Sequence, residues 1–172
     1  MKNILLWVLL GCVFMGNAQE EQEFSIPEYT LTIDGIVNEG LAIVTGERGK
    51  QRDWEAFRML FDVDAKISVV NHDSLGNAIL RVYSLSQFVR LGMRFYETDG
   101  FIEYEISSRV EEYNGMASVF QGYYAKELGF EEKGVNMYQL FHDGQRWWIT
   151  SLVWTNDRNG IMLPKKYDGP LK

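Results

Sequence analysis

The sequence predicts an α+β fold, with helices in its N-terminal half and an antiparallel sheet built mainly from its C-terminal half. Two observations support this prediction. Apolar residues recur at helical spacing in three segments before residue 100, and two pairs of long alternating segments follow, joined by Asn114-Gly115 and Asp143-Gly144. Asn-Gly and Asp-Gly between alternating apolar runs are typical of β-hairpins. We therefore expect helices followed by four long antiparallel strands.

The first 18 residues are expected to be a signal peptide (residues 1–18), removed on export to the periplasm or the medium. Lys2 supplies positive charge, an apolar stretch covers Ile4–Met15, and Gly16-Asn17-Ala18 has the small-x-small pattern of a signal-peptidase site. The stretch is too short for a comfortable transmembrane span. Cleavage after Ala18 would make Gln19 the first residue of the exported protein.

A bacterial lipoprotein is the alternative for the N-terminus. Leu9-Leu10-Gly11-Cys12 resembles a lipobox, which would leave an acylated Cys12 as a membrane anchor. Against it, Val13-Phe14-Met15 continue the apolar run where a polar tether is expected. Cys12 is the only cysteine of the sequence, so cleavage after Ala18 leaves neither a disulfide nor thiol chemistry.

Composition narrows the classes of partner. The net charge is −7, and the longest basic run is Lys165-Lys166. Such an acidic chain is a poor candidate for binding nucleic acid or an anionic membrane surface. Its length suits a single domain. We expect a leader over residues 19–27, one domain over residues 28–155 and a C-terminal tail over residues 156–172.

Three helices are predicted from apolar spacing and from their start and stop signals. The first ends at the Gly46–Gly49 loop, and Asp53 can cap the second. Ser84 and Gln87 form a capping-box pattern at the start of the third helix, which ends before Gly100. The three apolar stripes cover residues 33–44, 54–61 and 85–96.

Six strands are predicted, two short ones around the turn-rich segment His72–Asn77 and four long ones after the third helix. They are Ala65–Val70, Ala78–Tyr83, Phe101–Tyr113, Met116–Lys126, Val135–His142 and Trp147–Thr155. The last two form a hairpin that is apolar on both faces, so both faces must be covered. Helices can cover one face. For the other we expect a homodimer interface, formed by Phe141, Trp148, Leu152 and Trp154.

The alternative cover for that outer face is the tail around Ile161-Met162-Leu163, folded back within one chain. The length of the loop in the terminal hairpin is also undecided, and it determines which face of the hairpin meets the helices. An even-length loop directs Asn136 and Tyr138 toward the helices, whereas an odd-length loop directs Gln139 and Trp154 toward them.

Pairing across Asn114-Gly115 predicts which residues of the third and fourth strands face the helices. A two-residue turn pairs Ser108 with Gln121, and Tyr104 with Ala125. Glu103 and Glu105 then lie on the opposite, solvent-facing side, because burying unpaired carboxylates is costly. The inner strands are therefore expected to carry hydroxyls and an amide but no central carboxylate.

Three passages and the order of elements carry a resemblance to a known family. The passages begin at Arg52-Asp53-Trp54, Tyr113-Asn114-Gly115 and Gly134-Val135-Asn136. The chain resembles the nuclear transport factor 2-like superfamily, in particular its SnoaL-like bacterial members, over roughly residues 30–155. The resemblance implies a cone, in which three helices cover a curved sheet around a pocket, and an outer face that often mediates dimers. This fold hosts isomerases, dehydratases, epoxide hydrolases, ligand carriers and interaction modules.

The preferred hypothesis is a non-catalytic module that binds a small apolar or mixed-polarity ligand, or a partner. The expected pocket wall consists of Trp54, Tyr96, Tyr104, Ser108, Gln121, Tyr123, Asn136 and Tyr138. A core with a few satisfied polar groups is the plain alternative reading of these residues.

The alternative function is a SnoaL-like isomerase, dehydratase or hydrolase acting on a small cyclic substrate. Its base would come from outside the inner strands, with Asp53, Asp62, His72 and Glu112 as candidates. No cofactor is expected. No metal site is expected either, because the two histidines stand in separate segments without metal-ligand spacing.

Overall fold

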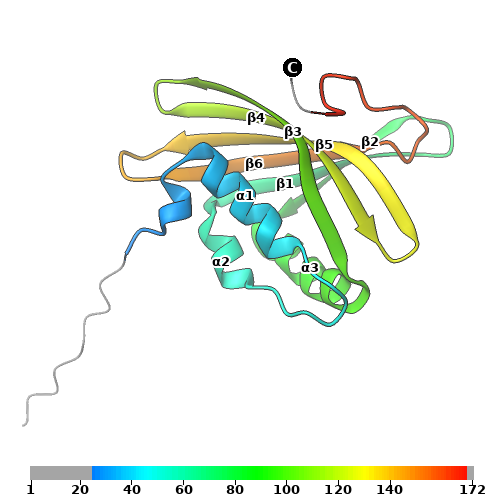
Figure 1. Ribbon diagram of the computed structural model, residues 1–172, viewed down its shortest axis with the longest axis horizontal. Coiled ribbons are helices and arrows are strands. Elements are labelled where there is room, and N and C mark those ends of the chain that lie inside the picture. Colours follow the sequence, from blue (N-terminus) through cyan, green and yellow to red (C-terminus); the bar gives the residue numbers. More distant parts are fainter. Residues whose placement is uncertain (1–24, 170–172) are drawn as a thin grey trace, which may run out of the picture.

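The computed structural model describes residues 25–169. A curved six-stranded sheet has the order β2-β1-β6-β5-β4-β3, and three α-helices lie against one of its faces (Figure 1). The helices are α1 (Ile33–Val44), α2 (Trp54–Met59) and α3 (Leu85–Asp99), preceded by a 3-10 turn, η1 (Glu28–Thr30). The strands are β1 (Phe61–His72), β2 (Ala78–Ser84), β3 (Phe101–Tyr113), β4 (Met116–Glu127), β5 (Phe130–His142) and β6 (Trp147–Asn156). The predicted signal peptide, Cys12 and most of the leader lie outside the described residues.

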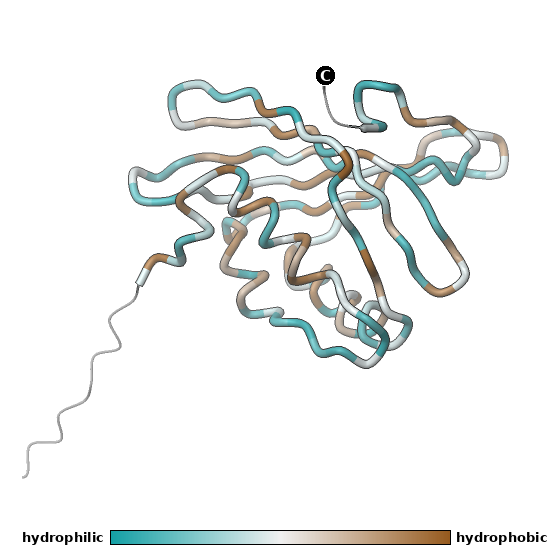
Figure 2. The backbone as a smooth tube through the Cα atoms, in the orientation of Figure 1, coloured by the Kyte–Doolittle hydropathy of each residue, from teal (hydrophilic) through white to brown (hydrophobic). Residues whose placement is uncertain are grey.

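The helices begin where the sequence predicts. The Asp53 carboxylate accepts a hydrogen bond of 2.9 Å from the backbone of Ala56 at the start of α2. Ser84 and Gln87 form the predicted capping box of α3. Helix α2 is shorter than predicted, because Phe61 already belongs to β1. Figure 2 shows hydrophobic and hydrophilic residues alternating along these helices, and a hydrophilic loop between α1 and α2.

The sheet is mixed rather than purely antiparallel as predicted. Strand β1 pairs with β6 in parallel, with Ile67 opposite Leu152 and Val69 opposite Trp154. The other four pairs of neighbouring strands are antiparallel. Each antiparallel pair joins two consecutive strands, so four hairpins fix these pairs locally. The direction of β6 beside β1 is set only when the chain between them, with α3 and four strands, has folded.

Arg52, the first residue of the Arg52-Asp53-Trp54 passage, organises the loop between α1 and α2. Its buried guanidinium donates hydrogen bonds to the carbonyls of Val44 and Gly46, over 3.2 and 2.5 Å. Trp54 is buried and donates its indole N–H to the Glu97 carboxylate over 2.9 Å. The passage thus joins α1, α2 and α3.

The β3–β4 hairpin has the predicted turn. The side of the sheet predicted for the residues of β3 is correct near this turn and wrong in the first part of the strand. Asn114 and Gly115 have φ values of 48° and 80°, and Ser108 lies opposite Gln121 as predicted. A β-bulge then follows, because Ile106 has no partner on β4 and Glu105, not Ile106, lies opposite Tyr123.

The bulge exchanges the two faces of β3 on its far side. Glu103 turns toward the helices, so its predicted solvent-facing position is wrong. Tyr104 turns to the outer face, where it is 50% exposed and packs on Tyr124 with ring centroids 5.0 Å apart. The prediction that Tyr104 faces the helices is therefore also wrong, because one unpaired residue reverses the alternation of a strand.

A second bulge lies in the terminal hairpin. The loop has four residues, so His142 lies opposite Trp147, but Thr150 is unpaired and Gln139 lies opposite Ser151. Asn136 and Tyr138 face the helices, as the even-length loop predicts. Leu152 and Trp154 also turn inward and pack in or against the core, which corrects their assignment to an outer dimer patch. Phe141 and Trp148 remain on the outer face.

The tail after β6 folds over the outer face of the sheet, opposite the helices (Figure 1). The rings of Tyr167 and Phe120 stack with centroids 6.2 Å apart, and Lys133 pairs with Asp168. Between the tail and the sheet lies an apolar cavity of about 440 Å³. Ile161, Met162 and Leu163 border this cavity, as the alternative of a folded-back tail predicts. The homodimer stays a prediction, for the uncovered part of this face.

Within residues 25–169, no helix combines the length and the apolar character needed to cross a membrane.

Candidate functional site

A cavity of about 240 Å³ lies between the inner face of the sheet and the helices. Eight of the residues that border it are aromatic, and several of their rings pack on one another. The rings of Tyr96 and Phe101 are stacked with centroids 4.4 Å apart, and those of Phe88 and Trp154 meet edge to face at 6.1 Å. The aromatic residues that border the cavity are Phe57, Phe61, Phe88, Tyr96, Phe101, Tyr123, Tyr138 and Trp154.

Glu103 brings a carboxylate to this aromatic cavity. Burial raises the pKa of Glu103 to about 7, the hydrogen bond from Asn136 opposes this rise, and the charge of Glu132 adds to it. The Asn136 amide donates to Oε1 of Glu103 over 2.8 Å. A carboxyl group with a pKa near neutrality can either accept or donate a proton under physiological conditions.

An amide network supports Glu103 from beneath. Gln121 is fully buried at 0% exposure and accepts hydrogen bonds from Asn136 over 3.2 Å and from the Tyr138 hydroxyl over 3.5 Å. Its own amide N–H group donates to the Glu105 carboxylate over 2.8 Å. Gln121 therefore orients Asn136, which in turn holds Glu103. The bulge in β3 makes this possible, because it places Glu105 on the inner side.

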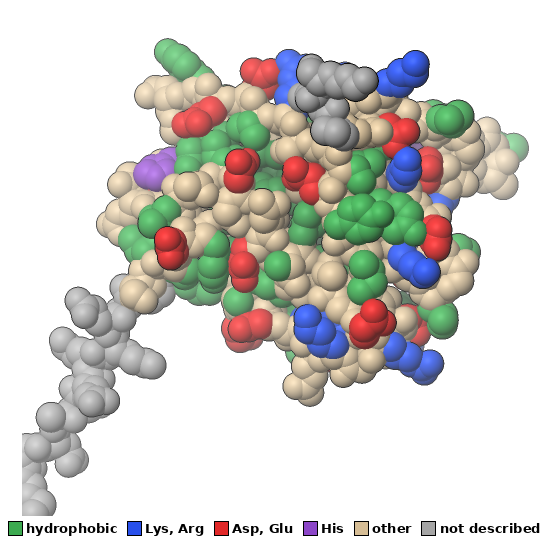
Figure 3. All heavy atoms as spheres, viewed as in Figure 1, with side chains coloured by type: hydrophobic (Ala, Val, Ile, Leu, Met, Phe, Trp, Pro, Cys, Tyr) green, Lys and Arg blue, Asp and Glu red, His purple; other side chains and the backbone are tan. Residues whose placement is uncertain are grey.

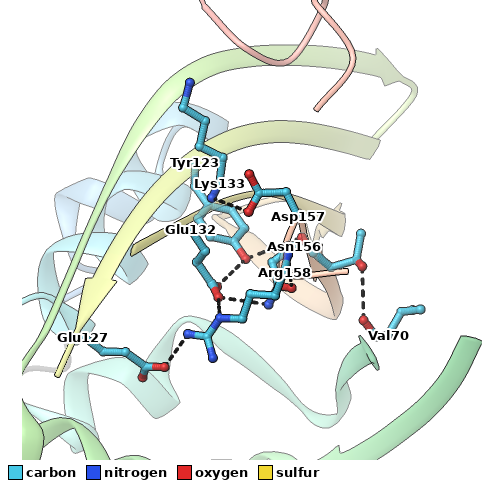
Figure 4. Close-up of polar contacts among 9 residues, drawn as sticks. Val70, Tyr123, Glu127, Glu132, Lys133, Asn156, Asp157 and Arg158 are labelled. Atoms are coloured by element: carbon cyan, nitrogen blue, oxygen red, sulfur yellow. Dashed lines mark hydrogen bonds and ion pairs between the residues drawn. The ribbon is translucent and has the colours of Figure 1, made fainter. Parts of the chain in front are cut away.

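A second carboxylate, Glu132, lies at the end of the cavity near the start of the tail (Figure 4). It accepts hydrogen bonds from the Tyr123 hydroxyl over 3.1 Å and from the Asn156 amide over 3.0 Å. The Arg158 guanidinium forms ion pairs with Glu132 and with Glu127. Burial raises the pKa of Glu132, and the charge of Arg158 opposes this rise. This cluster joins the β4–β5 hairpin to the beginning of the tail.

Only some residues of the predicted pocket wall border the cavity. Four of its residues border the cavity: Tyr96, Tyr123, Asn136 and Tyr138. Gln121 lies beneath them, and Trp54 lies behind Tyr96, with ring centroids 6.2 Å apart. Ser108 does not border the cavity, and Tyr104 lies on the opposite face of the sheet.

The four predicted base candidates do not border this cavity. Asp53 caps α2, and Asp62 accepts a hydrogen bond of 2.9 Å from the backbone of Asp64. His72 lies near the tail, with Nδ1 3.2 Å from the amide of Asn159, and Glu112 is exposed beside the β3–β4 turn.

The residues that sequence reasoning missed are Glu103, Glu127, Glu132 and Arg158. One signal was available for Glu103. Gly122 interrupts a strand pattern, and an isolated glycine within a strand often marks a bulge or a close backbone approach. Here it marks both, because Gly122 lies opposite Ser107 at the bulge, and an added Cβ would lie 2.0 Å from the carbonyl oxygen of Tyr167.

Over residues 25–169, no three His, Cys, Asp or Glu side chains are grouped so that they could hold a metal ion. The carboxylates at the cavity instead bind amide, hydroxyl and guanidinium groups, and Glu127 and Glu132 share Arg158.

Several solved structures are similar to this chain. An NTF2-like protein of unknown function from Pseudomonas aeruginosa has a TM-score of 0.55 at 12% identity, covering 70% of this chain and 94% of that one. An NTF2-like protein with a cystatin-like fold from Novosphingobium aromaticivorans has a TM-score of 0.55 at 14% identity, covering 72% and 78%. An NTF2-like protein of unknown function from Pseudomonas putida has a TM-score of 0.55 at 11% identity, covering 81% and 90%. No protein-family model and no curated protein matches the sequence. Identities this low show a shared fold and leave activity open.

Proposed function

We propose that this chain, which has the NTF2-like fold predicted from its sequence, binds a small and largely apolar molecule in the cavity beneath its helices. The observation that carries this proposal is the Glu103 carboxylate among aromatic walls. Apolar cavities with a few well-placed polar groups are the usual form of small-molecule sites. In this proposal the rings provide contact area, and Glu103 with Asn136 orients the polar end of the ligand.

Native mass spectrometry of protein purified from its own host tests this proposal, because it detects a small molecule that co-purifies. We expect an adduct whose occupancy falls in Tyr138→Ala and Glu103→Gln, since both residues border the cavity. Glu112→Gln is the matched control, because Glu112 is exposed and lies outside the cavity lining. An adduct retained in both cavity variants would contradict the proposed site.

A second candidate function is proton-transfer catalysis on a small cyclic substrate. Glu103 favours it, because the inner strands were expected to lack a base and Glu103 offers one with a pKa of about 7. Deuterium incorporation into cyclohexanone in heavy water tests this candidate by mass spectrometry. We expect faster exchange with the protein than with Glu103→Gln, and equal exchange with Glu112→Gln. Identical rates for the protein and Glu103→Gln would exclude Glu103 as a base for this probe.

Export is part of the proposal, and the SnoaL-like assignment remains a prediction. The support for export is the apolar stretch that ends at Gly16-Asn17-Ala18. N-terminal sequencing of the exported protein should show Gln19 as its first residue. A diacylglyceryl group on Cys12 would instead make this chain a lipoprotein.

A further inference from the structure

The cavity bears an excess of negative charge. The ionisable acids that border it include Glu103, Glu127 and Glu132, whereas Arg158 is the only cation among the described residues of its lining. Arg158 is paired with both Glu127 and Glu132, so it is not available to Glu103. On the face seen in Figure 3, acidic and basic side chains are mixed over the right half, whereas acidic ones predominate over the left half. The cavity lining thus shares the acidic excess of the whole chain, whose net charge is −7.

Glu103 has capacity for a further hydrogen bond. Asn136 occupies Oε1, and no described residue donates a hydrogen bond to Oε2. The Tyr123 hydroxyl donates to Glu132 and the Tyr138 hydroxyl to Gln121, so neither of these two donates to Glu103. The second oxygen is therefore a free acceptor, among the described residues, for a molecule that enters the cavity.

The aromatic walls suit a cation as well as an apolar skeleton. Eight aromatic side chains border the cavity, among them Tyr96, Phe101 and Trp154. Aromatic faces attract ammonium groups through the negative charge at the ring face. A carboxylate in such surroundings is costly to bury unless a partner charge accompanies it. A ligand ammonium would be that partner.

We propose that the ligand of this cavity is a small apolar amine, bound as its ammonium ion with the nitrogen at Glu103 and the carbon skeleton among the rings. The inference rests on the proposed function, since it names the chemical class of the small molecule. An anionic ligand is disfavoured by the three carboxylates. A neutral alcohol can donate a hydrogen bond to Glu103 but gains no charge attraction.

Isothermal titration calorimetry with three matched probes tests this inference: 2-phenylethylamine, 2-phenylethanol and phenylacetate. At pH 8 a carboxyl group of pKa about 7 is ionised, and an ordinary primary amine is protonated. We expect the amine to bind at least about tenfold more tightly than the alcohol, the gain typical of a charge-assisted hydrogen bond. Phenylacetate should bind most weakly.

The variant Glu103→Gln distinguishes the role of the charge from that of the cavity. It should remove the advantage of the amine and leave binding of the alcohol nearly unchanged, because the amide keeps the shape of the side chain. Glu112→Gln, outside the cavity, should keep the full advantage. Far-UV circular dichroism and urea unfolding of both variants verify that each is folded.

Three outcomes would overturn the inference. Equal binding of amine and alcohol, or tightest binding of phenylacetate, contradicts the amine and leaves the small-molecule site standing. An amine advantage that persists in Glu103→Gln contradicts the assignment of the nitrogen to Glu103. Binding of none of the three probes contradicts both the amine and the proposed site.

Discussion

The hydroxyl of Thr45 is hydrogen-bonded to both backbone polar groups of Glu103. It accepts a hydrogen bond of 3.0 Å from the Glu103 N–H group and donates one of 2.8 Å to the Glu103 carbonyl. Thr45 follows α1 directly, and the next residue, Gly46, pairs with Phe101. The end of α1 thereby holds the first part of β3 in the orientation that directs Glu103 into the cavity.

Replacing Thr45 with valine should therefore affect both stability and the environment of Glu103. Thr45→Val keeps the shape of the side chain and removes two hydrogen bonds, so we expect unfolding free energy to fall by about 1–3 kcal/mol. Urea unfolding measures this loss. Thr150→Val is the control, since Thr150 makes one hydrogen bond, of 3.1 Å, to the carbonyl of Gln139. An equal or greater loss in the control would contradict a special role for Thr45.

The raised pKa of Glu103 predicts a definite pH dependence of stability. The folded state holds this proton more tightly, since the pKa rises from 4.5 to about 7 on folding. Between these pH values the folded state binds more protons than the unfolded state, so unfolding free energy falls as pH increases. The total loss from this group is at most about 3 kcal/mol.

Glu103→Gln isolates this contribution from those of other titrating groups. Glu132 on β5 also has a raised pKa, and Tyr96, Tyr123 and Tyr138 face the same cavity. Relative to the wild-type protein, the variant should therefore gain stability between pH 5 and pH 8. Urea unfolding at both pH values measures the difference, and a parallel pH dependence in the two proteins would contradict the assignment.

The contact between Gly122 and the tail predicts that any side chain at this position displaces the tail. A Cβ on Gly122 would lie 2.0 Å from the Tyr167 carbonyl oxygen, which also accepts a hydrogen bond of 2.9 Å from Ser107. We expect Gly122→Ala to lower unfolding free energy by about 1–3 kcal/mol and to expose the tail to proteolysis. Gly40→Ala is the control, because its Cβ would meet Leu60 at an ordinary 3.6 Å. Unchanged protease resistance in Gly122→Ala would contradict this account.

The homodimer remains a prediction, with its interface on the part of the outer face that the tail leaves uncovered, around Phe141 and Trp148. Light scattering of the full chain at micromolar concentration should give about twice its mass of 19.9 kDa. Phe141→Glu should restore the monomer mass, because it places a charge in the expected interface. Leu75→Glu is the control, since Leu75 lies in the exposed β1–β2 turn. A monomer mass at every dilution of the wild-type protein would contradict the dimer.

Local chemistry explains which predictions succeeded. The capping box at Ser84 and the Asn114-Gly115 turn each depend on residues close together in the chain. Their hydrogen bonds form with little help from the rest of the molecule. The same is true of Asp53 at the start of α2. These signals were enough to place the helices, the two hairpins and the order of elements typical of the fold.

By itself, the sequence determined the elements, their order and the resemblance to the NTF2-like fold, because capping, turn chemistry and apolar spacing act over a few residues. Only the tertiary structure decided the parallel pairing of β1 with β6 and the two bulges, at Ile106 and Thr150. A bulge changes a strand by one residue, yet it reverses the faces of every residue beyond it. Whether it forms depends on packing against helices and tail on both sides of the sheet. The position of Glu103 in the cavity therefore depends on residues that are distant in sequence, among them Thr45 and Asn136, which form hydrogen bonds with it.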